Sequence, residues 1–240
     1  MQIVVDNILT SYQIFGDKNK TIVILPGWKG SVNEWIPIAR SLSTEFKVVL
    51  LDLPGFSQMV RPKESFGVFE YAEFVKRFLQ KVEIEKVILV GHSFGGRLAL
   101  ILASETSLVE KLILVDSAGI EKKGLSANVI SKLVPIAKIL PISIQNRIKN
   151  LVGSVDYKEA GEMRDIFVKI VNQDLSHLFK KIQIPTFIIW GERDNVVPVT
   201  FAKKFKEKIK GSRLRIVWGA GHEPHLQKPE QFQEILEDVL

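Results

Sequence analysis

The feature that most constrains this chain is the stretch 87–100, where a strand-like run meets a helical pattern across a Gly-rich turn. Val87–Val90 reads Val-Ile-Leu-Val, and Gly91-His92-Ser93-Phe94-Gly95 follows as a G-x-S-x-G pentapeptide. Glycines on both sides of the serine allow a strand and a helix to pack closely around a sharp turn. Such a turn holds the serine hydroxyl above the sheet, near the positive end of the helix. The stretch predicts a nucleophile at Ser93, with a plain strand-to-helix turn as the alternative.

Buried-strand patterns alternate with amphipathic helix patterns on both sides of this stretch. Continuous apolar runs of strand length, rich in β-branched residues, suit the buried strands of a parallel sheet. The alternation predicts a single α/β domain with a mostly parallel central sheet flanked by helices, whose site lies at the carboxyl ends of the strands. Strands are expected at 2–5, 7–15, 21–25, 46–51, 87–90, 111–115, 185–190 and 214–218, and helices at about 33–42, 68–82, 94–103, 199–210 and from 229.

Residues 120–180 interrupt this alternation. They contain no β-branched strand run, and Pro135, Pro141 and Gly153 divide the helical segments. We therefore expect a core formed by residues 1–119 and 181–240 and an all-helical lid insertion over 120–180. Ordinary crossover helices are the alternative.

Composition excludes several classes of protein. The formal net charge is +6, but the densest Lys cluster, 203–210, alternates with apolar residues as the solvated face of an amphipathic helix does. The chain has no cysteine, which excludes disulfides, thiolate metal sites and cysteine nucleophiles. No signal-peptide pattern begins the sequence, and no apolar stretch approaches membrane-spanning length. We expect a cytoplasmic protein that binds neither nucleic acid nor membrane.

A serine hydroxyl needs a base, and the chain offers four histidines. His92 lies within the turn and is expected to point away from Ser93, and His177 ends the insertion on a surface. His222 and His225 both follow the last strand. His222 is preceded by Gly-Ala-Gly, small residues that let the loop approach a site. The pattern favours His222 as the base and leaves His225 to support the loop through a hydrogen bond.

The base in turn needs a carboxylate to orient it. Asp194, Asp116 and Asp52 each end a predicted strand. Strand-end aspartates also cap turns and helices, which is the alternative for each of them. The order Ser93, then an aspartate, then His222 is the one expected for a nucleophile elbow in this kind of sheet, and it favours an orienting role over a capping role for Asp194. Asp116 is the competitor.

Two backbone N–H groups are expected to stabilise an oxyanion beside Ser93. The N–H of Phe94 comes with the turn. The second is predicted at Trp28, because Gly27 lets the loop after strand 21–25 bend inward. A plain Pro26-Gly27 turn is the alternative.

Over essentially its whole length the chain resembles the α/β-hydrolase superfamily. The matching motifs, in order, are Leu25-Pro26-Gly27-Trp28, Asp52-Leu53-Pro54-Gly55-Phe56, Gly91–Gly96, Gly191-Glu192-Arg193-Asp194 and Gly221-His222. The resemblance implies the α/β-hydrolase fold, with Ser93 as nucleophile, Asp194 as acid, His222 as base and oxyanion donors at Trp28 and Phe94. Two departures are Pro26, where the family often has histidine, and Ser57-Gln58, where Gly-Ser is usual.

Ser93 as the expected nucleophile argues against dehalogenase and epoxide-hydrolase activity, because the family members with those activities use an aspartate at this position. The expected reaction is two-step acyl transfer on a small-molecule substrate, with no metal or organic cofactor. Trp28, Phe56 and the lid's apolar stripes favour a small or medium apolar or aromatic ester, hence a carboxylesterase. Arg164 would instead favour carbon–carbon hydrolysis of a diketone-like ring-cleavage product, although it also suits an exposed ion pair. A non-catalytic scaffold is the alternative of another class, and we expect a monomer or homodimer.

Overall fold

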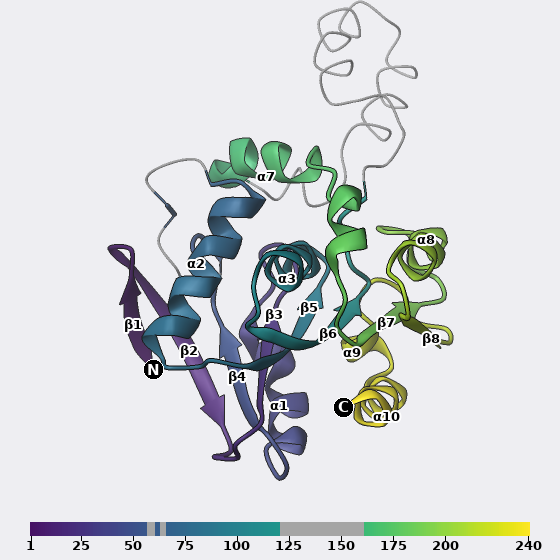
Figure 1. Ribbon diagram of the computed structural model, residues 1–240, viewed down its shortest axis with the longest axis horizontal. Coiled ribbons are helices and arrows are strands. Elements are labelled where there is room, and N and C mark those ends of the chain that lie inside the picture. Colours follow the sequence, from purple (N-terminus) through teal and green to yellow (C-terminus); the bar gives the residue numbers. More distant parts are fainter. Residues whose placement is uncertain (57–60, 63–65, 121–160) are drawn as a thin grey trace, which may run out of the picture.

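A computed structural model describes residues 1–56, 61–62, 66–120 and 161–240, and their strands form one sheet (Figure 1). Its strand order is β1-β2-β4-β3-β5-β6-β7-β8. The six strands from β4 to β8 run parallel, while β1 and β2 are antiparallel to their neighbours. The bounds are β1 Gln2–Val5, β2 Ile8–Phe15, β3 Thr21–Leu25, β4 Lys47–Leu51, β5 Val87–His92, β6 Val109–Val115, β7 Thr186–Gly191 and β8 Arg213–Val217.

Each predicted strand is present within one or two residues, because the apolar runs suit strands that are covered on both faces. Alternate residues of a strand point to opposite faces, so the core divides into two parts. In β3, Val23 and Leu25 join the apolar cluster of one face, and Ile22 and Ile24 join that of the other. The predicted mostly parallel α/β architecture is confirmed.

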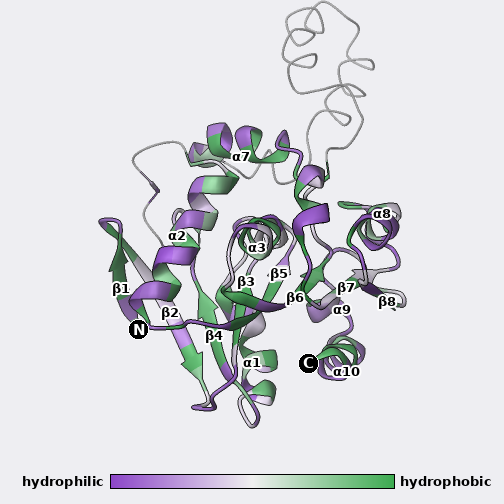
Figure 2. Ribbon diagram, in the orientation of Figure 1, coloured by the Kyte–Doolittle hydropathy of each residue, from purple (hydrophilic) through white to green (hydrophobic). Residues whose placement is uncertain are grey.

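Helices cover both faces of the sheet (Figures 1 and 2). The face that bears Val23 is covered by α2 (Val68–Lys81), α3 (Phe94–Glu105) and α8 (Thr200–Lys208). The opposite face is covered by α1 (Ile36–Leu42), preceded by the 3₁₀ turn η1 (Val32–Trp35), and by α10 (Pro229–Val239). Figure 2 shows hydrophobic and hydrophilic residues on different sides of the outer helices, as expected of helices that bury a single stripe. Helix α3 differs, because it is buried from Phe94 to Ala103.

The strand order exchanges β3 and β4 relative to the sequence. This exchange makes β3 the neighbour of β5, with Leu25 paired to Gly91. The loops after β3, β5, β6 and β7 therefore leave the same edge of the sheet from adjacent strands. That edge carries the predicted site residues.

The second part of the predicted lid is described, whereas residues 121–160 lie outside the described residues. The segment contains the 3₁₀ turns η2 (Gly161–Met163) and η3 (Ser176–Lys181), with α7 (Arg164–Val171) between them. The apolar residues Ile166, Phe167 and Ile170 of α7 are buried, and Lys169 Nζ lies 3.8 Å from Glu70. Helix α7 accordingly lies beside the first turn of α2 (Figure 1). The domain division at 120–180 stays a prediction. No described helix has the length and apolar character needed to cross a bilayer.

Candidate active site

Ser93 occupies a strained turn between β5 and α3. Its backbone has φ 49° and ψ −107°, a region that residues with a side chain rarely adopt. A Cβ at Gly91 would lie 2.6 Å from the carbonyl oxygen of Gly95, and a Cβ at Gly95 would clash with the carbonyl oxygen of Leu25. The two glycines therefore permit the close strand-helix contact that the pentapeptide predicted, and the hydroxyl of Ser93 remains at the sheet edge.

His222 lies between Ser93 and Asp194. Its Nε2 is 2.9 Å from Ser93 Oγ, and its Nδ1 is 2.8 Å from Asp194 Oδ2. An ionised carboxylate only accepts hydrogen bonds, so the Asp194 contact assigns the proton to Nδ1. Nε2 is then free to accept the hydroxyl proton of Ser93. This geometry suits a nucleophile, a base and an orienting acid.

Asp194 is held as an anion by several N–H donors. It is 5% exposed, and its Oδ1 accepts from the backbone N–H groups of Val196 at 2.7 Å and Val197 at 2.8 Å. Burial by itself would raise the pKa of Asp194, but the hydrogen bond and charge of His222 outweigh it, and the pKa is lowered. The side chain is therefore negatively charged at neutral pH.

The competing aspartates occupy other positions. Asp116 also lies at this edge, but its Oδ1 accepts from the N–H of Gly191 at 2.9 Å rather than from His222. Burial, followed by the neighbouring Asp194, raises the pKa of Asp116 well above its ordinary value. Asp52 follows β4, which is separated from β5 by β3. Of the three aspartates, Asp194 has the hydrogen bond to His222.

One group of side chains has ligand atoms close enough together to suggest a metal site. Ligand atoms of Asp116, Asp194 and His222 lie within 4.8 Å of one another. Both nitrogens of His222 and both oxygens of Asp194 already have the hydrogen bonds described above. We therefore assign no metal to this group.

The remaining histidines differ in their surroundings. His92 points away from Ser93, as predicted, and its Nε2 lies 2.8 Å from the carbonyl oxygen of His222. Burial lowers the pKa of His92 to about 3. The predicted hydrogen bond of His225 is wrong: neither ring nitrogen has a partner among the described residues, and the ring stacks on Trp35 at 4.0 Å between centroids. His177 is exposed, as expected.

The loop after β3 lies against the elbow, where the second oxyanion donor was predicted. The N–H of Gly95 donates to the carbonyl of Pro26 at 3.0 Å, and a Cβ at Gly27 would lie 3.5 Å from that of Ser93. Within the described residues, the backbone N–H groups of Trp28 and Phe94 have no hydrogen-bond acceptor. Both are available to an oxyanion, and their role stays a prediction.

Aromatic side chains gather beside Ser93. The ring of Trp28 contacts Phe56 at 5.2 Å, Phe94 at 5.6 Å and Phe167 of α7 at 5.2 Å between centroids. Phe56 is fully buried, and Trp28 is partly exposed. Arg164, the other predicted substrate-binding residue, begins α7 and is exposed.

A further charged residue of this region was not predicted. Arg97 of α3 is 5% exposed, and it donates to the backbone carbonyl of Gln173 at 2.6 Å, just after α7. Its position one helical turn after Ser93 was the available signal, because a cation among apolar helix residues needs a buried acceptor.

Comparison with known proteins agrees with this fold. A family model described as the alpha/beta hydrolase fold matches residues 20–135, which include the loop after β3 and the turn at Ser93. The chain has the α/β-hydrolase fold. The chain is 24% identical to the uncharacterized hydrolase YugF of Bacillus subtilis, over 98% of this chain and 96% of that protein.

Solved structures of this fold include an esterase, EaEST, from Exiguobacterium antarcticum. It has a TM-score of 0.79 and 24% identity, and the match covers 99% of this chain and 98% of EaEST. The meta-cleavage product hydrolase CumD from Pseudomonas fluorescens has a TM-score of 0.75 and 21% identity, and the match covers 100% and 96% of the two chains. Both likenesses concern the fold of this chain.

Proposed function

We propose that this α/β-hydrolase is a serine carboxylesterase in which Ser93, His222 and Asp194 form a catalytic triad. The single observation that carries the proposal is the position of His222, which has Ser93 Oγ at 2.9 Å on one nitrogen and Asp194 Oδ2 at 2.8 Å on the other. Such an arrangement activates a hydroxyl that is otherwise a weak nucleophile.

The mechanism follows from the donors and acceptors at the site. His222 Nε2 takes the proton of Ser93 as Oγ attacks the ester carbonyl, and the N–H groups of Trp28 and Phe94 stabilise the oxyanion. His222 then protonates the leaving alcohol, which leaves an acyl group on Ser93. A water deprotonated by His222 attacks this acyl-enzyme, and the acid departs. Asp194 keeps its charge throughout and stabilises the protonated His222.

The aromatic side chains near Ser93 support an apolar or aromatic ester as the substrate. Trp28, Phe94 and Phe167 offer ring surfaces and no charge, and rings of this kind favour apolar substrate groups. The exposed position of Arg164 gives no support to recognition of an anionic ring-cleavage product. An ester is therefore the preferred substrate class over a diketone acid.

A fluorophosphonate probe tests the proposal. We expect one equivalent of probe on Ser93 of the folded protein and none on Ser93→Ala or on heat-denatured protein. An unlabelled wild type, beside a control esterase that labels, would favour a non-catalytic scaffold.

A substrate panel then separates the reaction classes. We expect turnover of p-nitrophenyl esters of short and medium acyl length, and kcat of Asp194→Asn roughly 10³- to 10⁴-fold below wild type. Faster turnover of a dienone acid than of every ester would replace the esterase with a carbon–carbon hydrolase.

A further inference from the structure

Two buried carboxyl groups face each other behind His222. Asp116 follows β6 and Asp194 follows β7, and the N–H of Asp116 donates to the carbonyl of Ile189 at 3.0 Å, so the two strand ends are fixed side by side. Asp116 is fully buried and Asp194 is 5% exposed. An oxygen of each carboxyl lies within 4.8 Å of the other and of a His222 nitrogen. The proposed mechanism uses only Asp194.

Two ionised carboxylates at this separation in a buried site repel one another and lose their hydration. The titratable groups that face them are His222 and His92, and the pKa of His92 is about 3, which leaves that ring neutral at pH 7. One carboxyl must therefore keep a proton. Pairs of this kind share one proton, as other enzymes with close carboxyls do.

The hydrogen bonds decide which carboxyl is the acid. Asp194 accepts from three N–H donors, those of Val196, Val197 and His222, which stabilise an anion. Asp116 accepts from one, the N–H of Gly191, and within the described residues no donor reaches its Oδ2. An Oδ2 that has no donor is satisfied when it bears the proton itself.

We infer that Asp116 is a protonated positioning residue whose Oδ2–H donates a hydrogen bond to the Asp194 carboxylate and fixes it against His222. The inference rests on the proposed function, because Asp194 must orient His222 for the contact to matter. The raised pKa of Asp116, caused first by burial and then by Asp194, agrees with it. The backbone of Asp116 is also strained, with a φ of 42°, and this strain lowers the stability of the folded state.

Substitution by asparagine or alanine tests the role. Asp116→Asn keeps a neutral donor toward Asp194 and an acceptor for Gly191, and asparagine tolerates a positive φ. We expect its kcat to stay within about twofold of wild type. Asp116→Ala removes the donor, and we expect kcat to fall roughly tenfold with little change in KM. The rescue by asparagine separates a hydrogen-bond donor from an ionised acid.

Carbon-13 NMR of protein labelled at the aspartate carboxyl carbons provides a second readout that does not need the alanine variant to fold. We expect one aspartate carboxyl to be protonated at pH 7 in the wild type, and its signal to be missing in Asp116→Asn. A wild type with every aspartate ionised would overturn the inference.

Other outcomes distinguish this inference from the proposed function. An Asp116→Ala variant as active as wild type, or an Asp116→Asn variant as impaired as Asp116→Ala, would overturn the role of Asp116 alone. Activity retained in Ser93→Ala would instead overturn the proposed function. A lost activity in Asp116→Asn together with a retained activity in Asp194→Asn would make Asp116 the orienting acid and overturn both.

Discussion

The ring of His92 donates a hydrogen bond from Nε2 to the backbone carbonyl of His222 at 2.8 Å. His92 is the residue before the candidate nucleophile, and it is 5% exposed. A Cβ at Gly27 would lie 2.9 Å from its Nδ1, so the loop after β3 closes against the other side of the ring. A single buried side chain thus connects the turn at Ser93, the loop after β3 and the loop of the candidate base.

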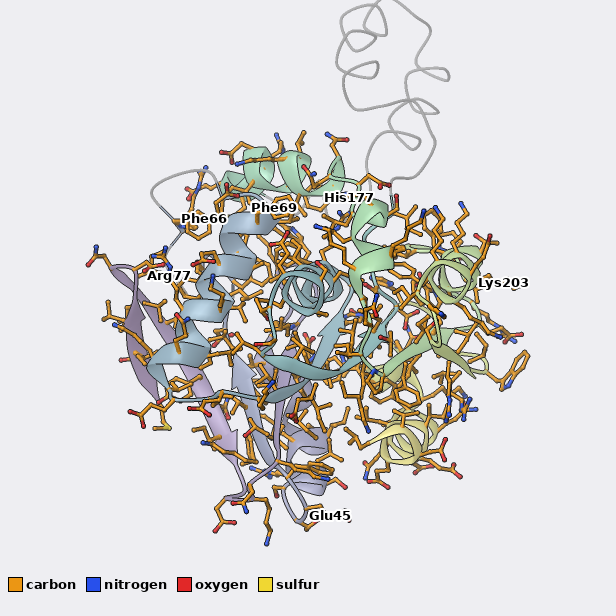
Figure 3. The ribbon with its side chains drawn as sticks, in the orientation of Figure 1. Glu45, Phe66, Phe69, Arg77, His177 and Lys203 are labelled. Atoms are coloured by element: carbon orange, nitrogen blue, oxygen red, sulfur yellow. The ribbon has the colours of Figure 1, made fainter. Side chains whose placement is uncertain are left out.

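His92→Leu is expected to slow catalysis while leaving the fold intact. The substitution leaves the carbonyl of His222 without its donor and loosens the position of the base, so kcat/KM should fall by about tenfold. Steady-state kinetics on a p-nitrophenyl ester measure the loss. His177→Leu is the matched control, because His177, labelled in Figure 3, is exposed. Equal rates for the two variants would show that His92 does not position the base.

Much of the fold and of the candidate site could be predicted from local sequence. The strands are continuous apolar runs and their ends carry Gly, Pro or Asp, so both their number and the edge that bears the site follow from pattern alone. Ser93, Asp194 and His222 each belong to a strand-end loop, and parallel strands bring such loops to one edge. Local pattern therefore placed Ser93 and His222 at this edge, but it left both Asp194 and Asp116 as strand-end aspartates that could contact the histidine.

Contacts that depend on how distant segments pack could not be predicted. The stacking of His225 on Trp35 requires α9 (Pro224–Gln227) to lie over η1, two segments almost 200 residues apart. The link between His92 and His222 likewise joins two loops across the sheet edge. Neither spacing nor composition encodes which ring nitrogen meets which carbonyl, and His225 therefore has a stacked ring where its loop position predicts a hydrogen bond.

His225→Phe is expected to make stability less sensitive to acid. Burial lowers the pKa of His225 to about 2, whereas the unfolded chain has the ordinary value near 6.5. Between these two pKa values the ring of His225 binds a proton in the unfolded state but not in the folded state. The free energy of unfolding is therefore not reduced by this residue above about pH 6.5, and it falls as the pH decreases below that value, by up to about 1.4 kcal/mol per pH unit. Phenylalanine can keep the stacking on Trp35 without titrating.

Urea unfolding at pH 7 and pH 5 measures this effect. The wild type should lose more stability between the two values than His225→Phe, and the residual loss in the variant is assigned to His92, whose pKa is also lowered. Identical losses in the two proteins would mean that His225 is not the buried neutral group described here.

Arg97→Met is expected to release α7 from α3. The guanidinium bonds to the carbonyls of Gln173 at 2.6 Å and Val171 at 3.5 Å, and burial lowers its pKa only to about 10, so it is charged at neutral pH. Loss of these bonds should cost about 2 kcal/mol of stability and speed proteolysis within 161–181. Arg77→Met is the control: Arg77 is half exposed (Figure 3), and its removal should change little. An Arg97→Met variant as resistant as this control would contradict the anchoring role.

Gly95→Ala is expected to disrupt the elbow itself. The added methyl would overlap the carbonyl oxygen of Leu25, and neither backbone can retreat, because the N–H of Gly95 also bonds to Pro26. The variant should lose at least about 3 kcal/mol of stability, together with labelling of Ser93 by fluorophosphonate. Gly211→Ala is the control, because no atom lies within 4 Å of its new Cβ and only the positive φ of 77° strains the alanine. We expect this variant to lose about 1 kcal/mol of stability and to keep the labelling of Ser93. A stable, labelled Gly95→Ala protein would mean that strand and helix do not approach as closely as this turn requires.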